Sequence, residues 1–325
     1  MKYIDYLKYA KELLNQNKYI KYNKKIEDET LSFTPYIYNE CSASCRFCSE
    51  QLIRNGKAMV CHGVCENYFD KLRKVLGDLH ESELFLSLSG KEPTESLDFL
   101  EGILKCVKDF ETAGGQIVEK VMYSNLSGLI ENMTKMGMLI EVYGIDRIEC
   151  SRHHFDEVKN QSIMRFKNQP IQKNEIFQQV MEELLEHVDV KQVCVVQKGG
   201  IDDVEQLKTY LEWAKSMGVS QVVFRELALF DDTVEMNATA RYIVNNRIEI
   251  KEFLDGLDES FKLVEITEGY YYMSFGYEYE GMKLWFEMSD YEEMEKKHGS
   301  NKVYKMIYYP NGKLCLDWNM NQEIL

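Results

Sequence analysis

The chain has 325 residues, of which 45% are apolar and 29% are charged, so it can form a full core and extensive disorder is excluded. Its formal net charge of −15 argues against nucleic-acid or anionic-membrane partners, because both carry negative charge. A small basic cluster, Lys18–Lys25, is more typical of a solvated helix end than of a binding patch.

The sequence shows no sign of export or membrane insertion. No apolar run reaches the roughly 18 residues that a membrane span requires. The N-terminus is lysine-rich but is interrupted by Asp5 and Glu12, which predicts a short amphipathic helix and not a signal peptide. Nine cysteines without a secretion signal favour the cytoplasm, where closely spaced thiols serve metal binding or catalysis and not disulfides.

Short apolar runs alternate with longer helical patterns between residues 32 and 229. We predict strands at 32–38, 84–89, 117–124, 146–151, 190–197 and 221–227, and helices near 66–79, 95–112, 127–137, 174–187 and 202–217. Strands separated by helices pair in parallel through right-handed crossovers. The expected fold class is α/β, a partial TIM-like (β/α)6 barrel, with its chemistry at the carboxyl ends of the strands.

The pattern changes after Phe230. A helix near 238–257 precedes a tyrosine-rich alternating segment that turns at Glu280-Gly281, and a second alternating segment turns at 310–312. Both segments predict β-hairpins. We therefore expect an N-terminal helical extension (1–30), a barrel (31–232) and a β-rich C-terminal appendage (233–325) near the barrel's open side.

Three cysteines, Cys41, Cys45 and Cys48, follow the first predicted strand with three and then two residues between them. Three thiolates on one tight loop can ligate three irons of a [4Fe–4S] cube and leave the fourth iron open to a cofactor. A zinc loop is the alternative. Zinc prefers four ligands, frequently as two Cys-x-x-Cys pairs, and no second pair of that spacing is present.

This spacing, with the aromatic Phe47 before the last cysteine, resembles the signature of the radical S-adenosylmethionine (SAM) enzymes. The segment 89–94, Ser-Gly-Lys-Glu-Pro-Thr, ends the next strand and resembles the Gly-Gly-Glu-Pro string of that family, with a lysine in place of the second glycine. The resemblance implies that this loop receives the amino group of SAM, for which a carboxylate and carbonyls supply acceptors. The loop residues so assigned are Gly90, Lys91, Glu92 and Pro93.

The resemblance covers roughly residues 32–230, and the fifth and sixth βα units look like those of the molybdenum-cofactor cyclase branch. By position, that branch implies contacts to the adenine, ribose or carboxylate of SAM at the strand ends and at the residue before the third cysteine. These further SAM-binding candidates are Phe47, Ser124, Asn125, Ser151 and Ala228.

The chain departs from that branch elsewhere. It lacks the auxiliary-cluster cysteines and the Gly-Gly tail, and Thr34 and Ser87 stand about where phosphate-binding arginines are expected. We therefore expect one cluster and no GTP cyclase activity. Cys61 and Cys65 are more typical of free thiols than of ligands for a second metal, since a closed zinc site takes four ligands.

Three residues are candidates for chemistry on the substrate. Arg152 follows the fourth strand and is expected to hold a carboxylate through a bidentate pair. His153 is a candidate acid, base or substrate ligand, with capping and solvent exposure as the alternative for it and for His154. Cys194 in the fifth strand would return a hydrogen atom to a substrate radical if it faces inward, and is otherwise a core cysteine.

The resemblance implies that a reduced cluster cleaves SAM to methionine and a 5′-deoxyadenosyl radical, which abstracts hydrogen from a small-molecule substrate in a specialised pathway. An electron donor such as flavodoxin or ferredoxin is expected. One alternative is a peptide-modifying enzyme, an epimerase or cross-link former, with the tyrosine-rich hairpin as a strand edge for the peptide. A non-catalytic metal-binding scaffold is the other.

Overall fold

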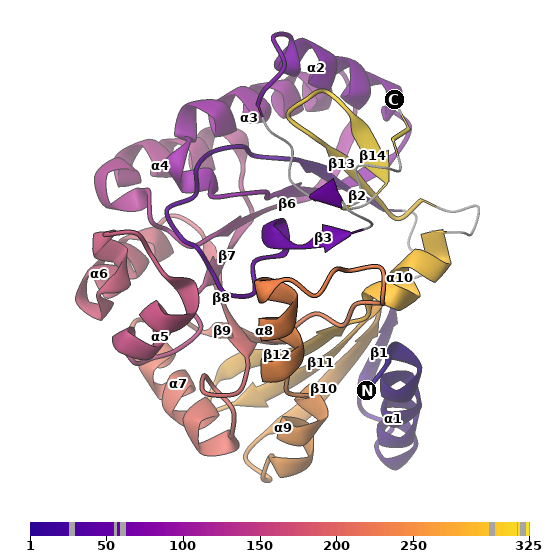
Figure 1. Cartoon of the computed structure of the whole chain (residues 1–325), viewed down its shortest axis with the longest axis vertical. Helices are drawn as coiled ribbons and strands as arrows, with labels where there is room; N and C mark the ends of the chain where they lie inside the picture. The colour runs from indigo at the N-terminus through magenta and orange to yellow at the C-terminus, as the bar shows by residue number, and fades with distance from the viewer. Residues whose placement is uncertain are drawn as a thin grey trace.

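The computed structural model describes residues 1–25, 30–54, 57–58, 63–298, 303–316, 318 and 323–324. Its centre is a curved sheet with the strand order β1-β10-β11-β12-β9-β8-β7-β6-β5-β2-β13-β14. Most of the helices form a layer around the outside of this sheet, whereas the segment that contains β3 and the helix labelled α8 lie on its inner, concave side (Figure 1). Among the residues described, none of the helices has the length and apolar character that a membrane crossing requires.

Six strands in the middle of the sheet pair in parallel. They are β2 (Leu31–Pro35), β5 (Glu83–Leu88), β6 (Gln116–Ser124), β7 (Arg147–Ser151), β8 (Asp189–Val196) and β9 (Gln221–Glu226). The helices between them are α2 (Tyr68–Asp78), α3 (Leu97–Thr112), α4 (Leu129–Tyr143), α5 (Glu157–Met164), α6 (Asn174–Leu185) and α7 (Val204–Ser216). The predicted strands and helices of the α/β fold are confirmed, and α5 is an addition.

The two C-terminal hairpins belong to the same sheet. β11 (Tyr272–Tyr279) and β12 (Met282–Ser289) lie between β10 (Lys262–Glu268) and β9, whereas β13 (Lys305–Tyr308) and β14 (Leu314–Leu316) lie beside β2. Both predicted turns are confirmed. The β-rich C-terminal segment extends the sheet on both sides of the six parallel strands, because each hairpin pairs with the free edge of a strand at one end of that set.

The N-terminal segment also joins the sheet. After α1 (Tyr3–Gln16), the short strand β1 (Lys21–Lys24) pairs in parallel with β10. The helix predicted at 238–257 is two helices, α8 (Ala238–Asn246) and α9 (Ile250–Gly256), because Arg247 takes an extended backbone between them. The remaining elements are η1 (Ser49–Gln51), β3 (Ile53–Arg54), β4 (Lys57–Ala58), η2 (Pro93–Glu95), η3 (Pro170–Gln172) and α10 (Tyr291–His298).

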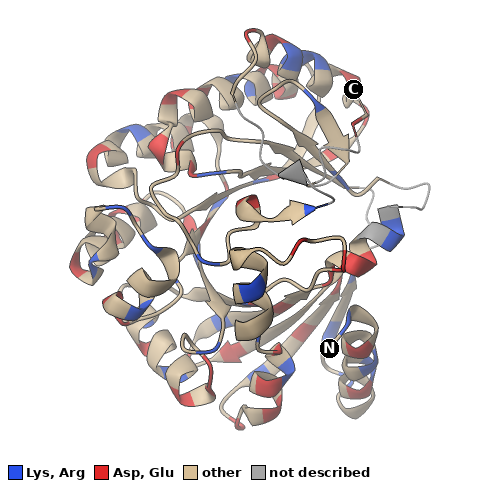
Figure 2. Cartoon of the chain, in the orientation of Figure 1, with Lys and Arg blue, Asp and Glu red and all other residues tan. Residues whose placement is uncertain are grey.

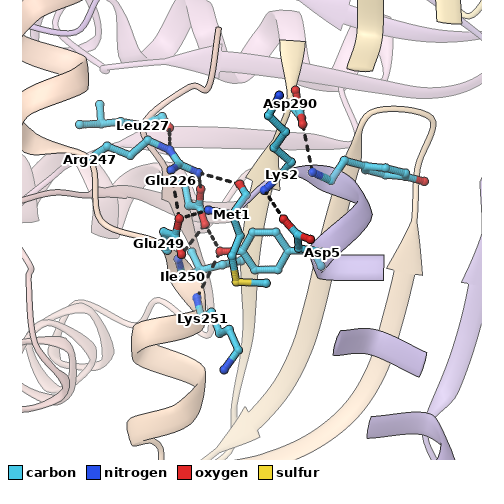
Figure 3. A network of polar contacts seen from close by, with 12 residues as sticks. Met1, Lys2, Asp5, Glu226, Leu227, Arg247, Glu249, Ile250, Lys251 and Asp290 are labelled. Atoms are coloured by element: carbon cyan, nitrogen blue, oxygen red, sulfur yellow. Dashed lines mark hydrogen bonds and ion pairs between the residues drawn. The ribbon is translucent and has the colours of Figure 1, made fainter. Parts of the chain in front are cut away.

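A buried polar network fixes the carboxyl end of β9 (Figure 3). The carboxylate of Glu226 accepts hydrogen bonds from the Tyr6 hydroxyl and from the Ile250 amide at 2.8 Å, and it pairs with Arg247. Arg247 Nε also donates to the carbonyl of Leu227 at 3.1 Å. Burial raises the pKa of Glu226, and the Arg247 guanidinium opposes that shift. The segment after β9 is therefore held at a defined position by α1 and α9.

The two faces of the sheet differ in polarity. The face toward the helices belongs to the main hydrophobic core, which includes Ile148 and Phe224. The register places ion pairs on the concave face, where Arg225 contacts Glu149 at 2.8 Å and Glu287 at 2.7 Å. Charged residues accordingly lie along the strands as well as on the outer helices (Figure 2). A polar concave face can receive a polar ligand.

Candidate active site

The cysteine loop, residues 41–48, lies at the carboxyl end of β2. Its three thiols, Cys41, Cys45 and Cys48, are free of disulfides and partly exposed. The backbone amides of Ser44 and Arg46 donate to carbonyls at the end of α5, each at 3.0 Å. These contacts bring the loop from β2 across to the end of α5, the helix that follows β7.

The three thiols lie close enough to influence one another electrostatically. Burial raises the pKa of Cys41 to about 12 and that of Cys48 to about 11, and burial followed by the two neighbouring thiols raises the pKa of Cys45. All three are therefore protonated near neutral pH in the absence of metal, and binding to iron would release protons. The side-chain amide of Asn125 donates a hydrogen bond to Cys41 Sγ at 3.9 Å.

The donor set fits a [4Fe–4S] cluster. Within the described ranges, no three side chains of His, Cys, Asp or Glu gather closely enough to hold a single metal ion. A cube instead takes one thiolate at each of three separate irons, so its ligands surround a volume and do not meet at one point. The cysteine loop supplies three such ligands.

The second loop, residues 89–94, packs on the backbone that leads to the cysteine loop. Gly90 has φ +130°, and a Cβ there would lie 2.6 Å from the carbonyl oxygen and 2.7 Å from the nitrogen of Ile37. Only glycine fits at this position. The next position tolerates a side chain: the ammonium of Lys91 lies 5.1 Å from the ring centroid of Tyr38, and its charge lowers the pKa of Cys48 against the effect of burial. The departure from a second glycine is therefore accommodated.

Glu92 joins this second loop to the carboxyl end of β6. Its Oε1 accepts hydrogen bonds from the Thr94 backbone amide at 3.1 Å, the Thr94 hydroxyl at 2.7 Å and the Ser124 hydroxyl at 2.5 Å. Its Oε2 accepts one from the Asn125 backbone amide at 2.7 Å. Burial raises the pKa of Glu92 to about 6, and these donors oppose that shift. With Oε1 fully used, only Oε2 has a lone pair left for another donor. The buried Pro93 begins η2 directly after it.

Glu95 is a site residue that sequence reasoning missed. Its carboxylate accepts from the Ser42 amide at 2.9 Å and from the hydroxyls of Ser42 and Ser127. It therefore ties the cysteine loop to the segment after β6. The available signal was a second carboxylate three residues after Glu92, but its partner Ser42 is too distant in sequence to be found from spacing.

Phe47 lies where the carboxyl ends of three strands meet. Its ring stands edge-on to that of His153, with 5.0 Å between the centroids. It also packs with Val195 and Leu227 in a small apolar cluster that includes Ala240 and Ile243 of α8. A flat apolar wall of this kind, beside a polar ring edge, suits an adenine.

His153 is held as a neutral ring. Its Nδ1 accepts from the Val195 amide at 3.0 Å, which places the proton of the neutral imidazole on Nε2. Burial, followed by the charge of Arg152, lowers the pKa of His153 to about 3. The ring can thus donate a hydrogen bond from Nε2 but does not act as a base near neutral pH. His154 is occupied locally, since its Nδ1 accepts from the Asp156 amide at 2.9 Å.

The expectation that Arg152 holds a ligand carboxylate is contradicted. Its guanidinium is buried and donates to the carbonyls of Ile171 and Gln172, each at 2.9 Å, and to Asn174 Oδ1 at 2.7 Å. Its charge also lies 4.6 Å from the ring centroid of Phe177 on α6. The side chain points into the helix layer because the backbone there leaves carbonyls that need a donor.

The inward orientation expected for Cys194 is also contradicted. Its register partner Phe224 lies in the core between sheet and helices, and Cys194 is fully buried there. Its thiol donates to the His153 carbonyl at 3.5 Å, and Gln192 on the same face donates to the Tyr210 hydroxyl of α7 at 2.7 Å. Cys194 is thus a core thiol, the alternative reading of the sequence.

The other candidates lie at the same carboxyl edge. Ser151 ends β7, and Ala228 lies just beyond β9; both are partly exposed. Cys65 lies near the second C-terminal hairpin, where its amide donates to the Pro310 carbonyl at 2.8 Å. Cys61 lies outside the described residues, so the expectation for that pair of thiols stays a prediction.

No family model matches the chain, and a search of the curated proteins found no match. Solved structures do match. "Native anSMEcpe with bound AdoMet and Cp18Cys peptide" is 12% identical, with 90% of this chain and 75% of that chain covered and a TM-score of 0.49. "Native anSMEcpe with bound AdoMet" is 13% identical, with 60% and 50% covered and a TM-score of 0.44.

A third match is "Crystal structure of HydG: A maturase of the [FeFe]-hydrogenase", 16% identical, with 69% of this chain and 47% of that chain covered and a TM-score of 0.47. The chain spans about half the length of the first structures that it matches. Because every one of these TM-scores lies below 0.5, assignment of a function rests on the residues of the site.

Proposed function

We propose that the chain is a radical SAM enzyme. One observation carries the proposal: Glu92 and Glu95 join the cysteine loop, the second loop and the carboxyl end of β6 into one hydrogen-bonded unit. Three thiols and a glycine-containing backbone loop therefore lie together at the edge of a parallel sheet where α/β enzymes place their chemistry.

In this proposal Cys41, Cys45 and Cys48 would ligate three irons of the cluster and would leave its fourth iron for SAM. When bound, these groups supply a 5′-deoxyadenosyl radical that abstracts hydrogen from the substrate; an electron comes from a donor such as flavodoxin or ferredoxin. The chain's own residues bind and orient. The backbone of loop 89–91 and the free lone pair of Glu92 would accept hydrogen bonds from the SAM ammonium, and His153 Nε2 would donate one beside the wall formed by Phe47.

We propose a small molecule as the substrate. The two features that favoured a peptide do not have the geometry required. The β11–β12 hairpin is paired on both sides, by β10 and by β9, so it offers no strand edge to a peptide. Cys194 faces α7 and not the concave face.

Anaerobic reconstitution tests the proposal. The purified chain should take up about four irons and four sulfides. With dithionite and SAM it should then form 5′-deoxyadenosine and methionine, detected by mass spectrometry. Iron uptake without 5′-deoxyadenosine would support the scaffold alternative, and failure to take up iron would overturn the assignment.

A further inference from the structure

A pocket of about 640 Å³ lies on the concave face of the sheet, against β1, β8, β10, β11 and β12. Small-molecule sites have volumes of roughly 300–1,000 Å³. Four lysines and two glutamates are among its lining residues. In a chain with a net charge of −15, this is a local excess of positive charge.

Both glutamates of the pocket already have partners. Glu265 accepts from Trp285 Nε1 at 2.9 Å, and Glu287 accepts from Arg225 Nε at 2.7 Å. Lys191 differs: within the described part of the chain it forms no ion pair, and its ammonium lies 4.0 Å from the ring centroid of Trp285. The ring holds the cation in place while leaving its hydrogens for a ligand.

The surroundings of Lys191 favour an incoming anion. Burial, followed by repulsion from Arg147, lowers the pKa of Lys191, while Glu149, Glu287 and Glu119 oppose the shift. All three glutamates already pair with arginines: Glu149 and Glu287 with Arg225, and Glu119 with Arg147. An anion placed on the ammonium would therefore relieve an unpaired, partly buried charge, which is costly to leave without a partner.

The register relates this pocket to the proposed site. Ser151 pairs with Val193 on β8, so Lys191 lies one strand across and two residues below Ser151. With about 4.8 Å between strands and about 3.3 Å per residue, their Cα atoms are roughly 8 Å apart. A small molecule held at Lys191 can thus extend to the edge where SAM is proposed to bind.

We propose that this pocket binds the substrate of the proposed reaction, and that the substrate is a small molecule with a carboxylate or phosphate group held by Lys191. This inference rests on the proposed function, because the bound anion is a substrate only if the chain is a radical SAM enzyme. The indole of Trp285 then forms an apolar wall beside the anionic group.

The probes are inorganic phosphate and malonate, titrated into the full chain with or without cluster and SAM. Binding is followed by the thermal midpoint and, in the cluster-free chain, by the emission of Trp285. Saturable binding that is at least tenfold weaker in Lys191→Met is expected. Lys191→Arg should restore it. The matched control is Lys283→Met, at an exposed lysine that lies on β12 two residues before Trp285, on the same face of the sheet. Whichever anion binds more tightly identifies the group.

An equal response in wild type and Lys191→Met, or the same response to potassium chloride, would overturn the pocket's role as an anion site. If Lys191→Met does not fold, Lys191→Gln replaces it. Trp285→Phe should abolish the change in tryptophan emission on anion binding, while the shift in thermal midpoint persists. Because these measurements need no reductant, loss of anion binding and loss of 5′-deoxyadenosine formation are separate outcomes, and each tests its own proposal.

Discussion

The helix-covered face and the concave face of the sheet use the same strands for different purposes. On β8, Gln192 and Cys194 point to α7, where Gln192 donates to the Tyr210 hydroxyl. The neighbouring Lys191 points to Trp285 and the pocket. A shift of one residue separates a core side chain from a candidate ligand-binding one, because side chains alternate along a strand.

The same division runs through the end of β7. Ser151 lies on the concave face, the Arg152 side chain enters the helix layer, and His153 turns its ring toward Phe47. Reactive residue types thus stand on both faces, and only position distinguishes them. Four pairs of measurements would break or sharpen this comparison.

The largest expected effect separates the thiols of the two faces. Cys48→Ala should lose most of the bound iron and reduce 5′-deoxyadenosine formation at least about a thousandfold, because the open-site cube needs three protein thiolates. Cys194→Ala should keep full iron content and SAM cleavage. Iron and sulfide analysis with product quantification checks both. Equal losses of iron and of 5′-deoxyadenosine formation in the two variants would contradict the assignment of Cys48 to the cluster and of Cys194 to the core.

Arg152→Met should lower the free energy of unfolding by about 3 kcal/mol, because the buried acceptors of Ile171, Gln172 and Asn174 lose a charged donor. Methionine keeps the packing against Phe177. Denaturant titration measures the loss. The dissociation constant for SAM should change less than twofold, and a tenfold increase would return Arg152 to the binding site.

Gly90→Ala should cost about 3 kcal/mol, the sum of a strained φ and a Cβ forced against Ile37. Gly281→Ala is the matched control, because Gly281 has φ +82° but nothing within 4 Å of its Cβ, so strain alone costs about 1 kcal/mol. Equal costs in denaturant titrations would show that the contact with Ile37 carries no weight.

The smallest effect depends on pH. The folded chain holds His153 neutral with a pKa of about 3, against 6.5 when unfolded, so below pH 6.5 the unfolded state binds one more proton. The free energy of unfolding should therefore decrease as the pH is lowered. His153 should account for about 1.4 kcal/mol of the decrease between pH 7.5 and pH 5.5. His153→Gln should remove that part, while the exposed His80→Gln should retain it.

Much of the fold could be predicted because its signals are local. The apolar runs at 84–89 and 190–197 became β5 and β8, and Glu280-Gly281 became a hairpin turn. The strand pairings of the hairpins could not be predicted, because alternation defines a strand without naming its neighbour. β10 was not predicted, because residues 262–268 mix polar and apolar side chains without a clear alternation.

The candidate site divides in the same way. The cysteine spacing and Gly90 are local, and the structure brings their loops together. The partners of Arg152 lie about one helix away in sequence, and the face that Cys194 occupies depends on the sheet's curvature. Alternation says which residues share a face but not which face is concave, so these two predictions failed where tertiary packing decides.

The two ends of the sheet have a consequence for the behaviour of the chain in concentrated solution. β1 has only four residues, two of them lysines, and the outer side of β14 is bridged by residues 323–324. A sheet that does not close into a ring leaves backbone groups on which another chain could add a strand. Short length and positive charge at one end, and a covering segment at the other, oppose polymerisation of the open barrel.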